Sequence, residues 1–349
     1  MKNKHVIIPI FVPHEGCPHN CVFCNQNTIT GNSEVIDDKF VRNTIEEYIE
    51  TIDINNSTIE VSFFGGTFTA IDIEKQRQLL AVAKEYKEKK LIKYIRLSTR
   101  PDYINHDILE HLRSYKVDII ELGVQSLDDE VLKKSGRGHN EKDVVFASRL
   151  IKEYGFTLGL QVMVGLPGDT EEKDIKTAEK IIEMKPTLVR IYPSLVITNT
   201  PMETMFKQGI YEPYTLEKAV EISKVIYKMF LKNNINVIRI GLQPTEDINV
   251  DGEIVAGPFH PAFRELVEAS LYKDILISKI PIGYSGEIYC SINPKDISKV
   301  YANKKKYFKE VLQVLGLKRL EVRQDKNILR NHLMIFLNGE SRVYNLDTE

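Results

Sequence analysis

The sequence has few cysteines, no long apolar segment and no excess of charge of either sign. Four cysteines in 349 residues are too few for the disulfide framework of a small secreted domain. No stretch reaches the roughly 20 apolar residues that a transmembrane helix needs. The first apolar run, "HVIIPIFV", is short, contains Pro9 and is followed by no small-residue cleavage site, which favours a strand over a signal peptide. These features predict a soluble, cytoplasmic protein without a membrane partner.

Charge and composition also exclude several classes. The formal net charge is -2, so no overall field attracts nucleic acid or membrane, although local patches remain open. Apolar residues make up 42% of the chain and charged residues 28%, which is typical of a globular protein. A chain of 349 residues can form a single α/β barrel with a large core.

Apolar, β-rich runs alternate with amphipathic helical patterns over the first 240 residues. The predicted strands are 5–11, 58–64, 94–99, 117–124, 157–164 and 188–193, and the predicted helices include 38–51, 73–90, 105–115, 141–154 and 171–183. Continuously apolar strands that alternate with helices indicate a parallel sheet covered by helices. Six such units predict a partial (β/α)6 TIM-like barrel rather than a closed barrel of eight.

The pattern changes after residue 240. We expect three parts: the partial barrel (1–240), a linking segment with a helix at 261–273 (241–285), and a small α+β domain (286–349). The last part reads as strand, helix, helix, strand and strand between residues 287 and 337.

Polar and glycine residues follow the predicted strands. They are Gly65–Gly66–Thr67, Ser98–Thr99–Arg100, Gln125–Ser126 and Gly165–Leu166–Pro167–Gly168. The carboxyl ends of parallel strands are the edge at which such sheets bind ligands. We therefore expect these residues to surround one site.

Three of the four cysteines lie just after the first predicted strand. Cys17, Cys21 and Cys24 have the spacing CxxxCxxC, while Cys290 stands alone in a β-like run and is interpreted as a small buried hydrophobe. Zinc would need a fourth ligand such as His14, His19 or Cys290. Three thiolates on one asymmetric loop are more typical of a 4Fe–4S cluster that leaves one iron free.

This loop, with an aromatic residue (Phe23) before its last cysteine, resembles the radical S-adenosylmethionine (SAM) superfamily. The resemblance implies that the free iron binds SAM and that reductive cleavage of SAM gives a 5′-deoxyadenosyl radical. It also implies two cofactors, the 4Fe–4S cluster and SAM, and a reductant partner such as flavodoxin or ferredoxin. Such a radical needs a site that excludes water.

Further motifs carry the same resemblance. "FFGGTFTA" (63–70) resembles the glycine motif at which the backbone approaches the methionine amino group, and it implies that Gly65, Gly66 and Thr67 bind the cofactor. "RLSTRPD", "ELGVQSLDDEVLKKSGRGH" and "LQVMVGLPGDT" follow in the family's order. By analogy with the coproporphyrinogen-oxidase-like branch, cofactor contacts are expected at Ser98, Gln125, Arg137 and Gln161. At Ser98 the relatives often carry an acid.

Residues 5–240 are most similar to the radical domain of the elongator catalytic subunit, which modifies the wobble uridine of tRNA. "IYPSLVITNTPM" (191–202) is the most discriminating segment. About 100 residues follow the barrel, which is too few for that subunit's acetyltransferase domain. The elongator reaction itself is therefore not carried over to this chain. What the resemblance implies is a radical SAM enzyme, a transferase or oxidoreductase, that modifies a nucleoside of tRNA or rRNA.

The C-terminal part carries a basic patch. Residues 299–330 contain ten Lys or Arg side chains and three acids, which is a plausible electrostatic footprint for phosphates. Its predicted order weakly resembles a KH domain, with Ala302–Asn303–Lys304–Lys305 in place of the GxxG loop that clamps a nucleic-acid backbone. Lys304, Lys305 and Lys306 are thus candidate RNA contacts; the alternative is a solvated helix face.

Two other functions stay open on the sequence. One is a radical SAM enzyme that acts on a small carboxylated metabolite, although the loop lacks that branch's Tyr and extra Gly. The other is a non-catalytic carrier of an iron–sulfur cluster or haem that kept the fold.

Overall fold

The computed structural model describes residues 4–12, 17, 19–25, 36–242 and 252–348. Seven parallel strands form one curved sheet in the order β1-β2-β3-β4-β5-β6-β8. The strands are β1 (Lys4–Val12), β2 (Ser57–Gly65), β3 (Tyr94–Thr99), β4 (Ile119–Gln125), β5 (Thr157–Val164), β6 (Leu188–Pro193) and β8 (Asn236–Ile240). The partial barrel expected from the sequence is confirmed, with a seventh strand, β8, beyond the six expected.

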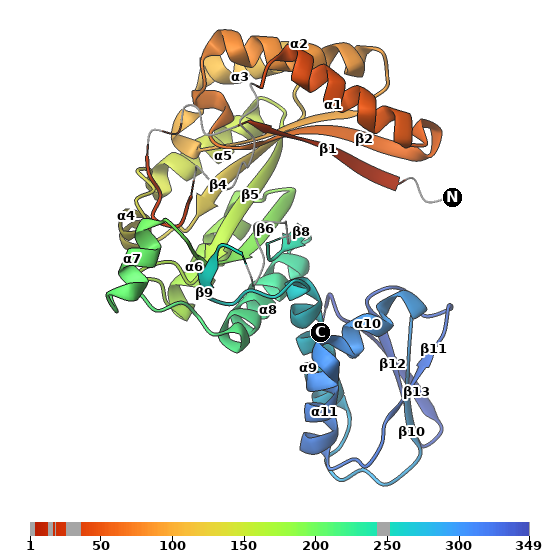
Figure 1. Cartoon of the computed structure of the whole chain (residues 1–349). Helices are drawn as coiled ribbons and strands as arrows, with labels where there is room; N and C mark the ends of the chain where they lie inside the picture. Colours follow the sequence, from red (N-terminus) through yellow and green to blue (C-terminus); the bar gives the residue numbers. More distant parts are fainter. Residues whose placement is uncertain (1–3, 13–16, 18, 26–35, 243–251, 349) are drawn as a thin grey trace.

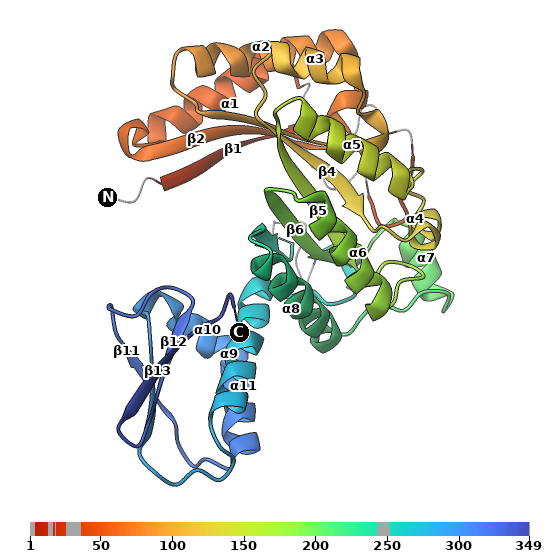
Figure 2. The same cartoon turned by 180° about the vertical axis from the view of Figure 1, so that it is seen from behind.

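Helices cover the outer face of this sheet (Figures 1 and 2). They are α1 (Asp38–Thr51), α2 (Ile73–Glu88), α3 (His106–Ser114), α5 (Glu141–Glu153), α6 (Glu171–Met184) and α8 (Leu216–Lys232). The short helices α4 (Asp129–Lys134) and α7 (Pro201–Lys207) lie at one end of the barrel instead. Most of them begin at a side-chain N-cap, and α5 has a full capping box between Asn140 and Asp143. Local sequence therefore fixes where these helices begin.

The two faces of the sheet have different residues because side chains alternate along a strand. Val61, Leu97 and Leu122 point outward and are buried in the core against the helices. The inner face carries polar and charged residues instead, among them Glu60 and Arg96, which are also buried. The core thus lies between sheet and helices, and the concave side is left for polar chemistry.

A second unit follows the barrel. Its sheet has the order β11-β10-β12-β13 and one parallel pair, β10 with β11. The elements are α9 (Phe263–Lys279), β10 (Ile288–Ile292), α10 (Ile297–Val300), α11 (Ala302–Leu315), β11 (Glu321–Gln324), β12 (His332–Leu337) and β13 (Glu340–Asn345). The α+β character is as expected; α9 is longer than the helix expected at 261–273, and β13 was not foreseen. The likeness to a KH domain stays a prediction.

Two short strands lie beside the cysteine loop, in one apolar cluster with Val22 and Phe23. β7 (Val196–Ile197) pairs with β9 (Ile254–Ala256) in an antiparallel arrangement. Among the residues that the structure describes, no helix has both the length and the apolar character needed to cross a membrane.

Candidate active site at the cysteine loop

The described part of the cysteine loop is docked onto two segments that are distant in the sequence. The Val22 amide donates to the Ser135 carbonyl at 3.1 Å, and the Met202 amide donates to the Val22 carbonyl at 2.9 Å. The buried amide of Asn25 donates to the Thr198 carbonyl at 2.9 Å. The loop is therefore held between the "SGRGH" segment after α4 and the "IYPSLVITNTPM" segment after β6.

An apolar contact accompanies these hydrogen bonds. Val22 and Phe23 pack on a small core cluster of Val196, Met202 and Tyr211. This contact explains the aromatic residue before the last cysteine: Phe23 anchors the loop to the segment after β6. It also gives Asn25, directly after the last cysteine, a structural role as a donor to that segment.

The glycine motif at the end of β2 lies beside the cysteine loop. At Gly65 a Cβ atom would lie 2.2 Å from the Val12 carbonyl oxygen, and the residue has a φ of +115°, so only glycine fits. The Gly66 amide donates to the same carbonyl at 3.4 Å. The buried Thr67 hydroxyl lies 3.3 Å from the Cys17 sulfur. The sequence-predicted residues of this motif and the first cysteine are thus neighbours.

Two further predicted residues lie near the cysteine loop: Gln125 is the last residue of β4, and Arg137 lies in the segment after α4. Arg137 is buried, and its Nη1 donates to the Cys21 sulfur at 3.2 Å while its Nη2 donates to the Gly123 carbonyl at 2.5 Å. The backbone of Gln125 is left-handed, with a φ of +68°, which is unusual for a residue other than Gly or Asn. Within the described residues the buried Gln125 Oε1 and Arg137 Nε have no hydrogen-bond partner.

The thiols themselves lie near one another. Burial, together with the thiols of Cys21 and Cys17, raises the pKa of Cys24 to about 12, while Arg137 acts in the opposite direction. Among the residues described, no three His, Cys, Asp or Glu side chains are close enough to hold a single metal ion. The three thiols of the loop are thus close enough to act on one another electrostatically.

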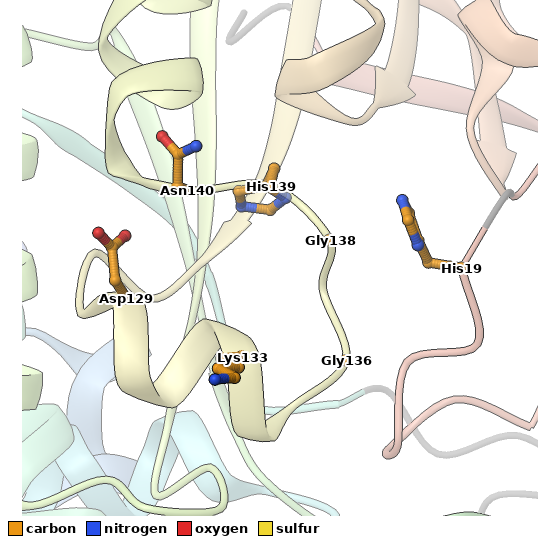
Figure 3. Close-up of a pocket in the computed structure, with 7 residues that line it drawn as sticks. All are labelled: His19, Asp129, Lys133, Gly136, Gly138, His139 and Asn140. Carbon is orange, nitrogen blue, oxygen red and sulfur yellow. The ribbon is translucent and has the colours of Figure 1, made fainter.

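A surface pocket of about 470 Å³ lies beside the loop, between His19 and the segment after α4 (Figure 3). Its lining comprises His19, Asp129, Lys133, Gly136, Gly138, His139 and Asn140. A Cβ atom on Gly138, which has a φ of +77°, would lie 2.3 Å from the His19 ring. Burial, with Arg137 and Arg100, lowers the pKa of His139 to about 3, so its ring is neutral at physiological pH.

The inner face of the sheet holds a buried ionic network that the sequence analysis missed. Glu121 on β4 accepts from Arg190 Nε at 2.7 Å and from Gln161 Nε2 at 3.1 Å, and it also pairs with Arg96. Arg96 Nη2 in turn donates to Glu60 at 3.0 Å. Burial raises the pKa of Glu121, but Arg190 and Arg96 outweigh it and hold that pKa below its usual range. The sequence did contain a signal for this network: β2, β3, β4 and β6 each carry one charged residue in an otherwise apolar or uncharged strand.

The remaining predicted residues are more scattered. Gln161 belongs to the ionic network, and the Ser98 hydroxyl is buried without a partner among the described residues. Lys304, Lys305 and Lys306 lie in the second unit, at the start of α11, where Lys306 donates to Glu217 at 2.7 Å. Cys290 is buried in the core of the C-terminal unit, as expected of a small hydrophobe, and His14 lies outside the described residues.

Comparison with known proteins identifies the family. The model of the radical SAM superfamily matches residues 11–181, and that of the radical SAM C-terminal domain matches residues 186–273. The chain belongs to the radical SAM superfamily. Its cofactors are therefore a 4Fe–4S cluster and SAM.

Individual relatives of this radical SAM chain are similar at moderate identity. A tRNA uridine(34) acetyltransferase of Methanocaldococcus jannaschii is 30% identical over 62% of this chain and 47% of its own length. The Elongator complex protein 3 of Bos taurus is 27% identical over 62% of this chain and 48% of its own. A solved archaeal Elp3 of Methanocaldococcus infernus superimposes with a TM-score of 0.61 at 25% identity, covering 78% of this chain and 64% of that one. This chain spans about half the length of the curated relatives it matches.

The residues present fit the radical SAM cofactors. Three thiols of one loop supply the soft sulfur donors that an iron–sulfur cluster requires. Next to them, the buried polar atoms without partners, Gln125 Oε1 and Arg137 Nε, are unusual in a folded interior and indicate a missing polar ligand. Gly65 is exposed beside the loop, and the close approach of the Val12 carbonyl requires glycine there.

Proposed function

We propose that this chain is a radical SAM enzyme that modifies a nucleoside of RNA, with tRNA as the first substrate to test. The observation that carries the proposal is the gathering of Cys17, Cys21 and Cys24 beside Thr67 and Arg137, at the carboxyl ends of the barrel strands. The RNA substrate is supported by relatives whose names state a tRNA uridine activity. Whether the reaction is a transfer or an oxidation is left open by this proposal.

The proposal gives each residue a role. Cys17, Cys21 and Cys24 hold the cluster, and the backbone at Gly65, Gly66 and Thr67 receives the methionine end of SAM. Arg137 offers a guanidinium Nε to the SAM carboxylate, because its other nitrogens already bond Cys21 and Gly123. Gln125 offers its free amide oxygen as an acceptor. Ser98 and Gln161 are weaker candidates for contacts with the cofactor.

When both cofactors are bound, reductive cleavage of SAM supplies a 5′-deoxyadenosyl radical that removes a hydrogen atom from the substrate. The chain's own part is to position the reacting groups and to exclude water. The buried ionic network contributes by fixing Arg190, whose guanidinium lies 5.5 Å from the Phe64 ring on the inner face of the sheet. A reductant such as flavodoxin or ferredoxin would deliver the electron, and a cytoplasmic location remains part of the proposal.

The test of the RNA substrate is mass spectrometry of nucleosides from bulk tRNA and rRNA, in cells with and without the protein. We expect one modified nucleoside to disappear in the deletion strain and to return with the wild-type gene. Complementation with a Cys21→Ser variant serves as the control and should not restore it. Identical nucleoside profiles in all strains would reject RNA as the substrate.

A second experiment tests the radical chemistry by itself. Protein reconstituted with iron and sulfide without oxygen, then reduced in the presence of SAM, should release 5′-deoxyadenosine, whereas a non-catalytic carrier should not. If 5′-deoxyadenosine forms while nucleoside profiles stay unchanged, a small carboxylated metabolite becomes the better hypothesis. Thermal protection by such a metabolite, with none by RNA, would support it.

A further inference from the structure

The C-terminal sheet buries only one of its faces. Cys290 and Ile292 on β10 and Leu333 and Ile335 on β12 are buried in the core. Helices α9, α10 and α11 lie on this side of the sheet (Figures 1 and 2). In the part of the chain that the structure describes, no helix or strand covers the opposite face, which points away from the barrel.

The open face carries a stack of three flat groups. Tyr289 on β10 and Phe336 on β12 are paired in register, and their rings are stacked with centroids 4.5 Å apart and planes 16° apart. On the other side of Tyr289, the Arg323 guanidinium lies 3.6 Å from the ring centroid. Both rings are only partly buried, and Arg323 is exposed. The three groups form a continuous row across strands β11, β10 and β12.

The surroundings of this row are partly apolar toward β13 and basic along the edge strand β11. By strand alternation Ser341, Met334 and Val343, which is 57% exposed, share its side of the sheet, and Ser291 on that side is buried. Residues 318–330, which include the edge strand β11, contain five Lys or Arg side chains and two acids. Glu321 takes two contacts from Arg323 at 3.0 Å, while Lys318, Arg319 and Lys326 are exposed around it.

We propose that this open face, formed by Tyr289, Phe336 and Arg323, binds single-stranded RNA by stacking bases on its flat groups. Both faces of the Tyr289 ring are covered, by Phe336 on one side and by Arg323 on the other, so a base can stack only on an end of the row. At the Phe336 end the residue opposite on β13 is the small Ser341, and cations along β11 attract the phosphates. This face is separate from Lys304, Lys305 and Lys306 at the start of α11, whose expected contacts are to the phosphate backbone. The choice of RNA as occupant rests on the proposed function.

The test is fluorescence anisotropy with a labelled oligouridine of about 12 nucleotides and the full-length protein. We expect Phe336→Ala to weaken binding about tenfold, which is typical of losing one stacked base. Tyr289→Ala should have a similar effect, because it removes the ring that supports Phe336 and Arg323 from between them. Tyr289→Phe keeps the ring and should bind as the wild type does. Tyr48→Ala removes a tyrosine that is 37% exposed on α1 and should have no effect.

Salt dependence separates stacking from phosphate contacts. Tyr289→Ala should leave the slope of log Kd against log salt unchanged, whereas Lys304→Ala with Lys305→Ala should reduce it by roughly two. Thermal melting checks folding, and Tyr289→Leu, which fills the volume without a ring, replaces the alanine variant if that variant unfolds.

Three results would overturn the inference. They are equal affinity of Tyr289→Ala and wild type, no oligouridine binding by the wild type, and a sedimentation change from dimer to monomer in the ring variants, which would make a second copy the occupant. If the Tyr289 and Phe336 ring variants still restore the modified nucleoside in the deletion strain, this inference alone is rejected. Absence of both binding and phenotype would reject the proposed function as well.

Discussion

At the scale of single residues, the site depends on positions where only one side chain fits. Gly65 is the clearest, because both its φ of +115° and the Val12 carbonyl exclude a Cβ atom. Gln125 is a second case, since it holds a left-handed backbone that costs energy for a residue of its size. Strain of this kind is maintained where the surrounding structure fixes it, and here both residues lie next to the cysteine loop.

A glycine pair tests this point. Gly65→Ala should destabilise the protein by several kcal/mol or abolish SAM binding, since the new methyl group would lie 2.2 Å from a backbone oxygen. Gly155 also has a positive φ, of +83°, but nothing lies within 4 Å of its Cβ position. Gly155→Ala should therefore cost only about 1 kcal/mol. Thermal melts with and without SAM measure both; equal losses would show that the Val12 contact is unimportant.

At the scale of elements, the inner face of the barrel is held by charge rather than by apolar packing. Glu121 on β4 is fully buried and bridges to Arg96 on β3 and Arg190 on β6. A buried network of this type is poor evidence for stability, because desolvation offsets the attraction, but removal of one partner leaves a buried charge. The strands are thus tied in one register by their charges.

Glu121→Gln should therefore destabilise the protein by roughly 3–5 kcal/mol, because Arg96 and Arg190 would lose their shared carboxylate. Urea unfolding followed by circular dichroism measures the difference. Glu110→Gln, an exposed residue on α3, is the matched control and should change stability by less than about 0.5 kcal/mol. A small effect at both positions would mean that the network contributes little to the fold.

Two carboxyl groups lie close together where β5 is followed by α6: the half-buried Asp169 in the loop and the buried Asp174 in the first turn of α6. Burial raises the pKa of both Asp169 and Asp174, and for Asp174 the neighbouring Asp169 adds to the rise. The Tyr214 hydroxyl donates to Asp174 at 3.0 Å, and the Tyr211 hydroxyl donates to the Gly165 carbonyl at 2.7 Å. This pair therefore fixes the segment before α8 onto the glycine loop while at least one proton is retained.

The sign of the pH effect follows from these raised pKa values. The protonated pair stabilises the fold fully at acidic pH, and this contribution is lost as pH rises through the raised native pKa values. Asp174→Asn, which keeps a neutral group, should be more stable than the wild type at pH 9 by roughly 1–3 kcal/mol. Thermal melts from pH 5 to 9 test it against Glu179→Gln on the exposed face of α6. Parallel pH profiles for wild type and Asp174→Asn would contradict the assignment.

At the scale of the whole molecule, α9 connects the barrel to the C-terminal unit. Its residues are buried nearly all round, as expected of a helix packed on both sides. Lys224 on α8 pairs with Asp274 on α9 at 2.7 Å, and Lys299 on α10 pairs with Glu268 on α9 at 2.9 Å. The three-part division at residues 240 and 285 is our proposal for the chain's organisation, with α9 as the shared element.

A shared helix predicts shared unfolding. We expect one cooperative thermal transition for the whole chain, because melting of the C-terminal unit would expose the apolar face of α9 and α8. Differential scanning calorimetry measures this directly. Lys306→Ala, which removes the ion pair with Glu217, should lower the midpoint only slightly, since exposed pairs contribute about 0–1 kcal/mol. Two separate transitions would show that the units unfold independently.

The local pattern of the sequence was enough for the elements and the family. Alternation of apolar runs with helical segments predicted six of the seven barrel strands, since continuously apolar strands are distinctive in a parallel sheet. The seventh, β8, was not predicted: it has only five residues, and Asn236 and Arg239 interrupt its apolar pattern. The CxxxCxxC spacing, with Phe23 before its last cysteine, carried the resemblance to the superfamily, and the match of the family model confirmed it.

What the sequence by itself determined is what depends on neighbouring residues: strand and helix periods, caps, and the cysteine spacing with its cofactors. Only the tertiary structure decided which distant groups meet. The bridge from Glu121 to Arg190, the carboxyl pair beside Tyr214 and the row of Arg323, Tyr289 and Phe336 each join residues from separate strands or loops. The physical reason is that side-chain contacts between strands depend on register and burial, which the fold sets and which no local pattern encodes.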